Sequence, residues 1–223
     1  MFDFIAKHLD SIGGVVFDFG GVMAPAPGDD WPLYPFFGRA GIDMAAVKDW
    51  NARYRPLADR GDITMEELYA SLLADRGVDP PEPDFCRRAA EIDGEGWANF
   101  MPVTYELMKE LKALGKKLGI LSNMSQFYYE HYFTTVAAHI RALCDAEVIS
   151  WKEHLLKPGR EIYDISSSRL GLPPERLLFL DDTPVNVEAA RALGWKAEIY
   201  EVRAVAALAA QLGWPAGVAN ADS

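Results

Sequence analysis

Three short apolar runs in the sequence each end abruptly in polar residues whose side chains can do chemistry. Residues 14–17 lead into Asp18, residues 118–121 into Ser122 and Asn123, and residues 177–180 into Asp181 and Asp182. Such runs are typical of strands buried on both faces of a parallel sheet. Because ligands bind at the carboxyl ends of parallel strands, we expect these side chains to form one site.

Each polar end also has a simpler interpretation when it is considered alone. Asp18 is compatible with a turn aspartate that accepts nearby amides. Asp181 and Asp182 are compatible with acids at a helix N-terminus, and Ser122 or Asn123 with a helix cap. The recurrence of the pattern at three strand ends favours a shared site, in which hydrogen bonds or a cation compensate the carboxylates.

The composition is that of a globular protein with one sizeable domain, or one domain and a small insertion. The chain has 223 residues, of which 50% are hydrophobic and 25% charged. Its formal net charge of -11 disfavours a nucleic-acid partner, because no basic cluster is present to contact a phosphate backbone. No run approaches the length of a membrane span and no signal-peptide pattern is present, so we expect a cytoplasmic protein without membrane association. Cys86 and Cys144 are interpreted as packing residues, since two distant cysteines indicate neither a disulfide framework nor a zinc site.

Residues 25–101 contain no strand-like run and are predicted to form a helical insertion. A linker rich in proline, glycine and aspartate introduces it. Thr64 and Glu67 have the spacing of a capping box, and apolar residues follow at helical intervals. A small separate core is expected from the aromatic residues Trp31, Phe36, Phe37, Trp50, Trp97 and Phe100.

From residue 102 onward, helical and strand-like segments alternate. A helix is predicted to end at Gly115, and another to begin with Thr183 as its N-cap and Pro184 as its first residue. This alternation predicts right-handed crossovers and a parallel sheet, hence an α/β fold. The predicted parts are a core at 14–24 and 102–214, the insertion at 25–101, an N-terminal extension at 1–13 and a disordered tail at 215–223.

The order of these motifs resembles that of the haloacid dehalogenase superfamily of hydrolases, in the group with a helical cap after the first strand. The resemblance covers residues 14 to about 200. It rests on four signatures, which are Asp18-Phe19-Gly20-Gly21-Val22, Leu121-Ser122-Asn123, Lys157-Pro158, and Asp181-Asp182-Thr183 followed by Asn186. It implies a Rossmann-like core with residues 25–101 as the cap. It also implies that the strand before Asp18 lies between the strands that end at Ser122 and at the acidic pair.

The resemblance implies a Mg2+-dependent phosphatase that acts on small phosphomonoesters. Asp18 is expected to be the nucleophile and to form an aspartyl-phosphate that water then cleaves. Mg2+ is expected to bind Asp18, Asp182 and the backbone carbonyl of Gly20. Asp181 and Asn186 are expected to surround these ligands or to contact the ion through water.

The same resemblance implies how the substrate is held. Ser122, Asn123 and Gly21 are expected to bind the phosphoryl group, and Lys157 to neutralise it or the nucleophile. The expected partner is a small phosphorylated metabolite, such as a hexose 1-phosphate, and the protein is expected to be a monomer or a homodimer. Specificity is expected to depend on the cap aromatics and on the arginines Arg39, Arg53, Arg55 and Arg60.

Gly20 departs from the family pattern, because most phosphatases of the family carry an aspartate two residues after the nucleophile. That aspartate protonates the leaving group, and such general acid-base help is worth roughly a hundred- to ten-thousand-fold in rate. One hypothesis is that the leaving oxygen is already stable as an anion, as in a sugar 1-phosphate. Another is that Asp29 or Asp30, on the linker, supplies the acid.

Two other functions are compatible with the sequence. In a metal-independent 2-haloacid dehalogenase-type hydrolase the aspartate attacks carbon, but the acidic pair Asp181 and Asp182 disfavours this chemistry. A non-catalytic binding protein would keep the fold, and with it the cation, and use the cap as a partner surface.

Overall fold

Five parallel strands form one sheet within residues 2–211, which are the residues that this computed structural model describes. The strands are β1 (Gly14–Phe17), β2 (Lys117–Ser122), β3 (Ala146–Ile149), β4 (Leu177–Asp181) and β5 (Lys196–Ile199). Their order across the sheet is β3-β2-β1-β4-β5, so β1 lies between β2 and β4. The predicted α/β fold and the predicted neighbours of the first strand are therefore confirmed. The tail predicted at 215–223, and residues 212–214 of the predicted core, lie outside the described residues.

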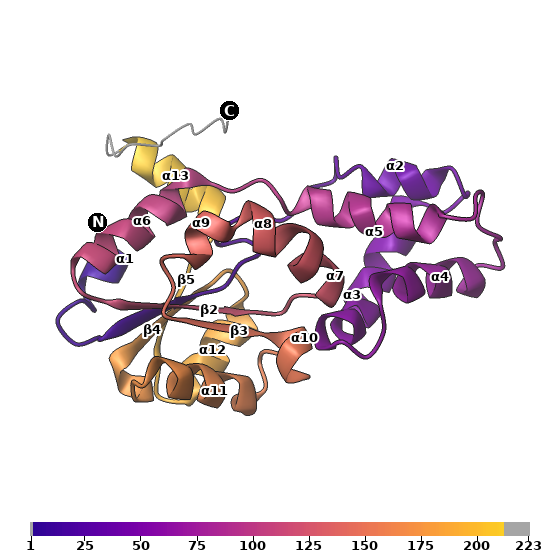
Figure 1. The fold of residues 1–223 in the computed structure, drawn as a ribbon. Coiled ribbons are helices and arrows are strands. Elements are labelled where there is room, and N and C mark those ends of the chain that lie inside the picture. The colour runs from indigo at the N-terminus through magenta and orange to yellow at the C-terminus, as the bar shows by residue number, and fades with distance from the viewer. Residues whose placement is uncertain (1, 212–223) are drawn as a thin grey trace.

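Helices cover both faces of this sheet (Figure 1). One face is covered by α11 (Arg160–Leu170) and α12 (Pro184–Ala192). The other is covered by α6 (Pro102–Ala113) and α13 (Val202–Gln211), with the short α1 (Asp3–Ala6) and α9 (Ala138–Arg141) beside them. Successive residues of β1 point to opposite faces, as the pleat requires: Val15 and Phe17 belong to the cluster under α6, and Val16 to the cluster under α11.

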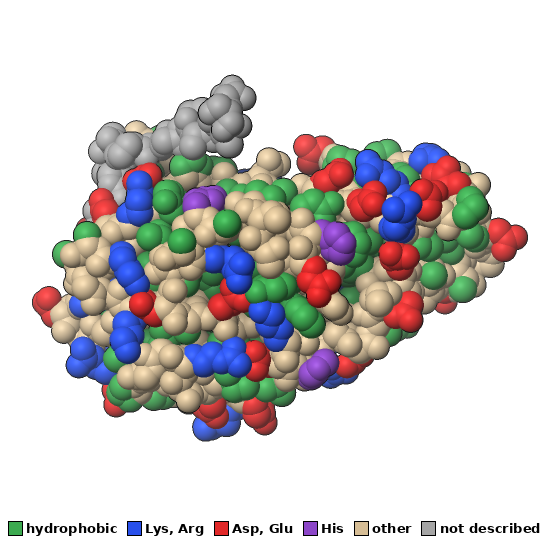
Figure 2. All heavy atoms as spheres, viewed as in Figure 1, with side chains coloured by type: hydrophobic (Ala, Val, Ile, Leu, Met, Phe, Trp, Pro, Cys, Tyr) green, Lys and Arg blue, Asp and Glu red, His purple; other side chains and the backbone are tan. Residues whose placement is uncertain are grey.

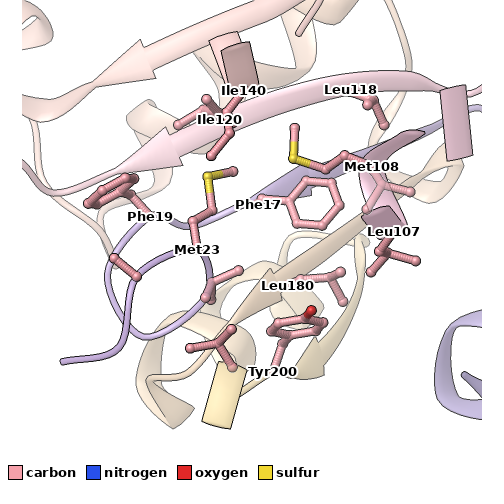
Figure 3. Close-up of a cluster of buried hydrophobic side chains, with 14 of the residues drawn as sticks. Phe17, Phe19, Met23, Leu107, Met108, Leu118, Ile120, Ile140, Leu180 and Tyr200 are labelled. Atoms are coloured by element: carbon pink, nitrogen blue, oxygen red, sulfur yellow. The ribbon is translucent and has the colours of Figure 1, made fainter. Parts of the chain in front are cut away.

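The hydrophobic cluster on the α6 side packs against one face of the first strand. Figure 3 shows Phe17 of β1 and Leu180 of β4 packed among Leu107 and Met108 of α6, and Tyr200 after β5. All five side chains are fully buried. Both faces of β1 are thus closed to water, which leaves its carboxyl end as the place where a polar residue reaches a cavity.

Short helical segments follow the strands at this carboxyl end. After β2 the chain forms α7 (Gln126–Tyr128), a π-helical turn (Tyr129–Phe133) and α8 (Thr134–Val136). After β3 it forms α10 (Ser150–Glu153), and a 3-10 turn (Pro174–Arg176) precedes β4.

The segment between β1 and α6 is helical and carries its own buried cluster, shown at the right of Figure 1. Its helices are α2 (Leu33–Gly38), α3 (Met44–Arg60), α4 (Met65–Asp75) and α5 (Phe85–Gly96). The capping box at the start of α4 is confirmed: the Glu67 amide donates to Thr64 Oγ1 at 3.0 Å, and the Thr64 amide donates to Glu67 Oε2 at 2.7 Å.

The prediction that Trp97 and Phe100 belong to the core of the insertion is wrong. Both side chains pack instead against the cluster on the α6 side of the sheet. The Phe100 ring meets the Phe19 ring edge-on, with 5.5 Å between centroids, and Tyr128 Oη donates to the Trp97 carbonyl at 3.0 Å. The reason is their position after α5, where the chain returns to the sheet.

The end of α3 is fastened to the sheet domain beside the strand ends. The Ser150 hydroxyl at the start of α10 donates to the backbone carbonyl of Asp59, and His154 Nδ1 lies 3.1 Å from the carbonyl of Arg60. These contacts hold the last turns of α3 above the carboxyl end of the sheet.

Figure 2 shows positive and negative side chains interspersed over both parts of the molecule on the face in view. Within residues 2–211 no helix has the length and apolar character needed to cross a bilayer.

Candidate active site

The polar residues at the ends of β1, β2 and β4 meet at one edge of the sheet. Asp18 follows β1, Ser122 ends β2, and Asp181 ends β4. One carboxylate oxygen from each of Asp18, Asp181 and Asp182 lies within 4.8 Å of the others. The structure thus brings together residues that are more than 160 positions apart in the chain.

Lys157 reaches this cluster from the loop after α10. Its Nζ lies 2.9 Å from Asp18 Oδ1 and 2.6 Å from Asp181 Oδ2, and its side chain is 1% exposed. Asn123 fixes the Lys157 backbone on both sides, because its Oδ1 accepts from the Lys157 amide at 2.9 Å and its Nδ2 donates to the Lys157 carbonyl at 3.1 Å. The Asn123 side chain therefore positions Lys157.

The two adjacent acids after β4 have different environments. Asp181 is fully buried and accepts hydrogen bonds from the Thr183 amide at 2.8 Å, from Asn186 Nδ2 at 3.1 Å and from Lys157. Asp182 is only partly buried and faces the cavity. Its Oδ1 accepts from the Thr183 hydroxyl at 3.2 Å.

Thr183 occupies the N-cap position of α12, as predicted, but its side chain makes no capping hydrogen bond. The hydroxyl donates to Asp182 instead.

A glycine is required at position 21 by both backbone conformation and space. Its φ is +72°, and a Cβ on it would lie 2.1 Å from Asp182 Oδ2.

The electrostatics of the cluster favour an added cation. Burial raises the pKa of Asp18 to about 7 against the opposing effect of Lys157, and Asp181 raises it further. Burial, with the charge of Asp181, also raises the pKa of Asp182. Burial disfavours the charge of Lys157, yet the two carboxylates beside it outweigh that effect and raise its pKa. Since one lysine balances three carboxylates, a divalent ion with oxygen ligands fits this donor set.

A cavity of about 330 Å³ opens above these residues, between the sheet domain and the insertion. Its floor includes Asp18, Gly20, Ser122, Asn123 and Asp182. Its roof comes from Trp31, Trp97 and one face of α3, where Asn51, Arg55 and Asp59 follow one another at intervals of four residues. Asn51 and Asp59 were missed by the sequence prediction, although their four-residue spacing was readable from the chain. Trp31 and Trp97 belong to the aromatic residues of the insertion on which specificity was expected to depend.

Of the four arginines expected to set specificity, Arg55 alone lines this cavity among the described residues. Its Nε lies 3.0 Å from Asp59 Oδ1 and its Nη1 lies 2.8 Å from Asp93 Oδ2. The other three are paired with acids near the surface of the insertion: Arg39 with Glu82, Arg53 with Asp49, and Arg60 with Asp62.

The space beside Gly20 is occupied by the Trp97 ring. A Cβ on Gly20 would lie 2.9 Å from Cζ3 of that ring. Neither linker acid lines the cavity: Asp29 is 80% exposed and pairs with Lys48, and Asp30 lines a separate hollow beside residues 25–28. The hypothesis that Asp29 or Asp30 supplies the missing acid thus receives no support from their positions.

The fold is an α/β sheet domain with an inserted helical unit, and its acidic cluster lies at the carboxyl ends of the strands. Residues 12–194 match the family model described as haloacid dehalogenase-like hydrolase, and the chain belongs to this family.

Named relatives include both phosphatases and dehalogenases. Acyl-CoA dehydrogenase family member 10 of Mus musculus is 26% identical over 217 residues, which is 92% of this chain but 20% of that protein. The (S)-2-haloacid dehalogenase of Pseudomonas putida is 28% identical over 41% of this chain and 40% of its own length. The phosphoglycolate phosphatase of Salmonella typhimurium is 27% identical over 83% of this chain and 80% of its own. The chain thus spans at most two fifths of the first two relatives.

Solved structures share the fold. A haloacid dehalogenase family enzyme from Bacteroides thetaiotaomicron, in complex with magnesium and inorganic phosphate, has a TM-score of 0.68 at 16% identity, covering 84% of this chain and 93% of that one. CbbY from Rhodobacter sphaeroides, in complex with phosphate, has a TM-score of 0.57 at 20% identity, covering 84% and 85%. At these identities the likeness concerns the fold.

Proposed function

We propose that the protein is a Mg2+-dependent phosphatase of small phosphomonoesters, with Asp18 as the nucleophile. The observation that carries this proposal is the contact between Asp18 and Lys157 at the floor of a cavity that Asp182 also lines. Magnesium and phosphate in the Bacteroides thetaiotaomicron enzyme, which has the same fold, support the same chemistry.

The residues at the strand ends fit a magnesium ion. Asp18, Asp182 and the backbone carbonyl of Gly20 would hold it, while hydrogen bonds from Asn186 and Lys157 hold Asp181 in place beside them. A bound Mg2+ supplies positive charge that draws a phosphate dianion toward three carboxylates and stabilises the charge of phosphoryl transfer.

Asp18 lies at the end of a buried strand, where its amide donates to the Leu180 carbonyl at 2.9 Å. Its Oδ1 accepts from the Phe19 amide at 2.7 Å, which fixes the carboxylate in place. One Asp18 oxygen attacks phosphorus as the bond to the leaving oxygen breaks, and water then attacks the aspartyl-phosphate to release phosphate and restore the carboxylate. Lys157, held by Asn123, neutralises charge at Asp18 throughout. The Ser122 hydroxyl, at the floor of the cavity, contacts the phosphoryl oxygens. Gly21 was also expected to bind them, but its amide donates to the Ala24 carbonyl at 2.7 Å and its carbonyl accepts from the Val202 amide, so its backbone is already paired within the protein.

The leaving oxygen receives no proton from residue 20, because Gly20 has no side chain and Trp97 fills the space beside it. The chemistry therefore favours substrates whose leaving oxygen is a relatively stable anion, such as the anomeric oxygen of a hexose 1-phosphate.

The test is phosphate release from a panel of sugar 1-phosphates, sugar 6-phosphates and aryl phosphates, with Mg2+ and with chelator. We expect release that requires Mg2+ and that Asp18→Asn abolishes. The control is Asp49→Asn, a change of the same kind at an exposed ion pair on α3. Absence of release from the whole panel, or full activity of Asp18→Asn, would refute the proposal. Halide release from 2-haloacids without Mg2+ would instead favour the dehalogenase chemistry.

A further inference from the structure

The roof of the cavity contains a buried ion cluster in which one cation faces two anions. Arg55 on α3 pairs with Asp59 one turn later and with Asp93 on α5. The side chains of Arg55 and Asp59 are 19% and 14% exposed, and that of Asp93 is 3% exposed. Arg55 and Asp59 line the cavity, whereas Asp93 lies behind them.

The cluster contains two carboxylates and one guanidinium group, so one negative charge is left without a positive partner. No second cation forms an ion pair with Asp59 or Asp93 among residues 2–211. Asp93 Oδ1 is buried and has no hydrogen-bond partner within the described part of the chain. Burial raises the pKa of both Asp59 and Asp93, although Arg55 opposes that rise at both acids, Lys157 at Asp59 and the Trp97 indole at Asp93. The two carboxylates are thus only partly compensated for the loss of water.

Arg55 is therefore poorly suited to bind an anionic group of the substrate. Its Nε and Nη1 already face Asp59 and Asp93, so a substrate carboxylate on the remaining nitrogen, Nη2, would be a third anion beside a single cation. An anion that approached without displacing them would meet Asp59, which is the negative group of this cluster on the cavity wall.

The remaining wall suits an uncharged molecule. Trp31, Trp97 and Tyr128 line the cavity together with Arg55 and Asp59. Aromatic faces bury the apolar face of a sugar or polyol. A partly exposed carboxylate accepts hydrogen bonds from hydroxyl groups.

We propose that the cap half of the cavity selects phosphomonoesters whose leaving group carries hydroxyls and no negative charge, and that Asp59, Asp93 and Arg55 together reject phosphorylated carboxylic acids. This selection rests on the phosphatase function proposed above and names its substrate class. Asp59 acts by its negative charge at the leaving-group side of the cavity.

The test compares substrates that differ by one group, a hydroxymethyl against a carboxylate. The pairs are glycerol 3-phosphate with 3-phosphoglycerate, and glucose 1-phosphate with glucuronic acid 1-phosphate. We expect kcat/KM to be at least tenfold higher for the uncharged member of each pair, because the acid meets an uncompensated like charge. Asp59→Asn removes that charge and is expected to reduce the preference by tenfold or more, chiefly through a lower KM for the acid. Asp49→Asn, on the exposed side of the same helix, is expected to leave the preference unchanged.

Competitive inhibition of the wild-type protein by two phosphonates tests the same preference and does not depend on how well a variant folds. 2-Hydroxyethylphosphonate is expected to compete at least tenfold better than phosphonoacetate. Equal or better use of the acids by the wild-type protein, or an unchanged preference in a folded Asp59→Asn, overturns the inference while the phosphatase function stands. Failure to release phosphate from any of the four esters and from an aryl phosphate with Mg2+ overturns both.

Discussion

The contact between Gly20 and Trp97 predicts that an aspartate placed at position 20, beside the nucleophile, will destabilise the protein. Gly20 does not have a positive φ, so its backbone accepts a side chain, and the obstacle is the indole. A Cβ at this position would lie 2.9 Å from Cζ3 and 3.6 Å from two further ring atoms, Cε3 and Cη2. Gly20→Asp therefore forces the half-buried ring of Trp97 to move by several tenths of an ångström, and the carboxylate needs further room.

Overpacking of this kind costs about 1–3 kcal/mol of unfolding free energy. Trp97→Ala alone removes packing and is expected to cost about 2–4 kcal/mol. The double variant lacks the clash, so its cost should fall short of the sum of the two single costs by about 1–3 kcal/mol. Urea denaturation of the four proteins measures this coupling. Gly38→Asp is the matched control, because a Cβ on Gly38 meets no atom within 4 Å.

The same variants test the role of the missing acid in catalysis. Once Trp97 is removed, an aspartate at position 20 is able to protonate a leaving alkoxide, and general acid catalysis is worth about 10²–10⁴ in rate. The gain should appear in the double variant with alkyl phosphates and be small with aryl phosphates, whose leaving groups are already stable anions. Additive stability costs, or a Gly20→Asp protein as stable as the wild type, would refute the steric argument.

Three further predictions concern the cluster and the cap. Lys157→Met leaves Asp18 and Asp181 buried without their cation, so urea denaturation should show a loss of about 3–5 kcal/mol, and wild-type stability would contradict the assigned pairing. The pKa of Asp18 is raised to about 7 by burial in the metal-free protein. A cation must displace that proton, so Mg2+ affinity measured by calorimetry should fall about tenfold from pH 8 to pH 6, whereas a flat profile would contradict a raised pKa. Thr64→Ala removes one half of the capping box and should cost about 1 kcal/mol in urea denaturation; no loss would mean that the helix end is stabilised by packing alone.

The strands and most helices could be predicted because their signals are local. The apolar run of β1 and the helical spacing before Gly115 each identify an element without knowledge of its neighbours. The alternation of elements then restricts the connections to right-handed crossovers, and these place the polar strand ends at one edge. This edge contains Asp18, Ser122 and the acidic pair, as the sequence analysis expected.

The roof of the cavity could not be predicted in the same way, because it depends on how the insertion folds back. Trp97 resembles the other aromatic residues of the insertion in sequence, and only the return of the chain after α5 places it against Gly20. The arginines were likewise equivalent until the orientation of α3 was known. Arg55 faces the cavity with Asp59, whereas Arg53 pairs with Asp49 near the surface.

The acids at the strand ends and the acids in the roof differ in how their charge is balanced, and we therefore expect them to have different roles. At the strand ends, three carboxylates face one lysine, and a divalent cation removes the excess of two negative charges. In the roof, Asp59 and Asp93 share one arginine, and their excess of one charge lies on the part of the cavity that the insertion provides. The floor is therefore suited to attract a phosphate with its metal, while the roof repels a second anion. A substrate that satisfies both halves has its whole negative charge on the phosphoryl group.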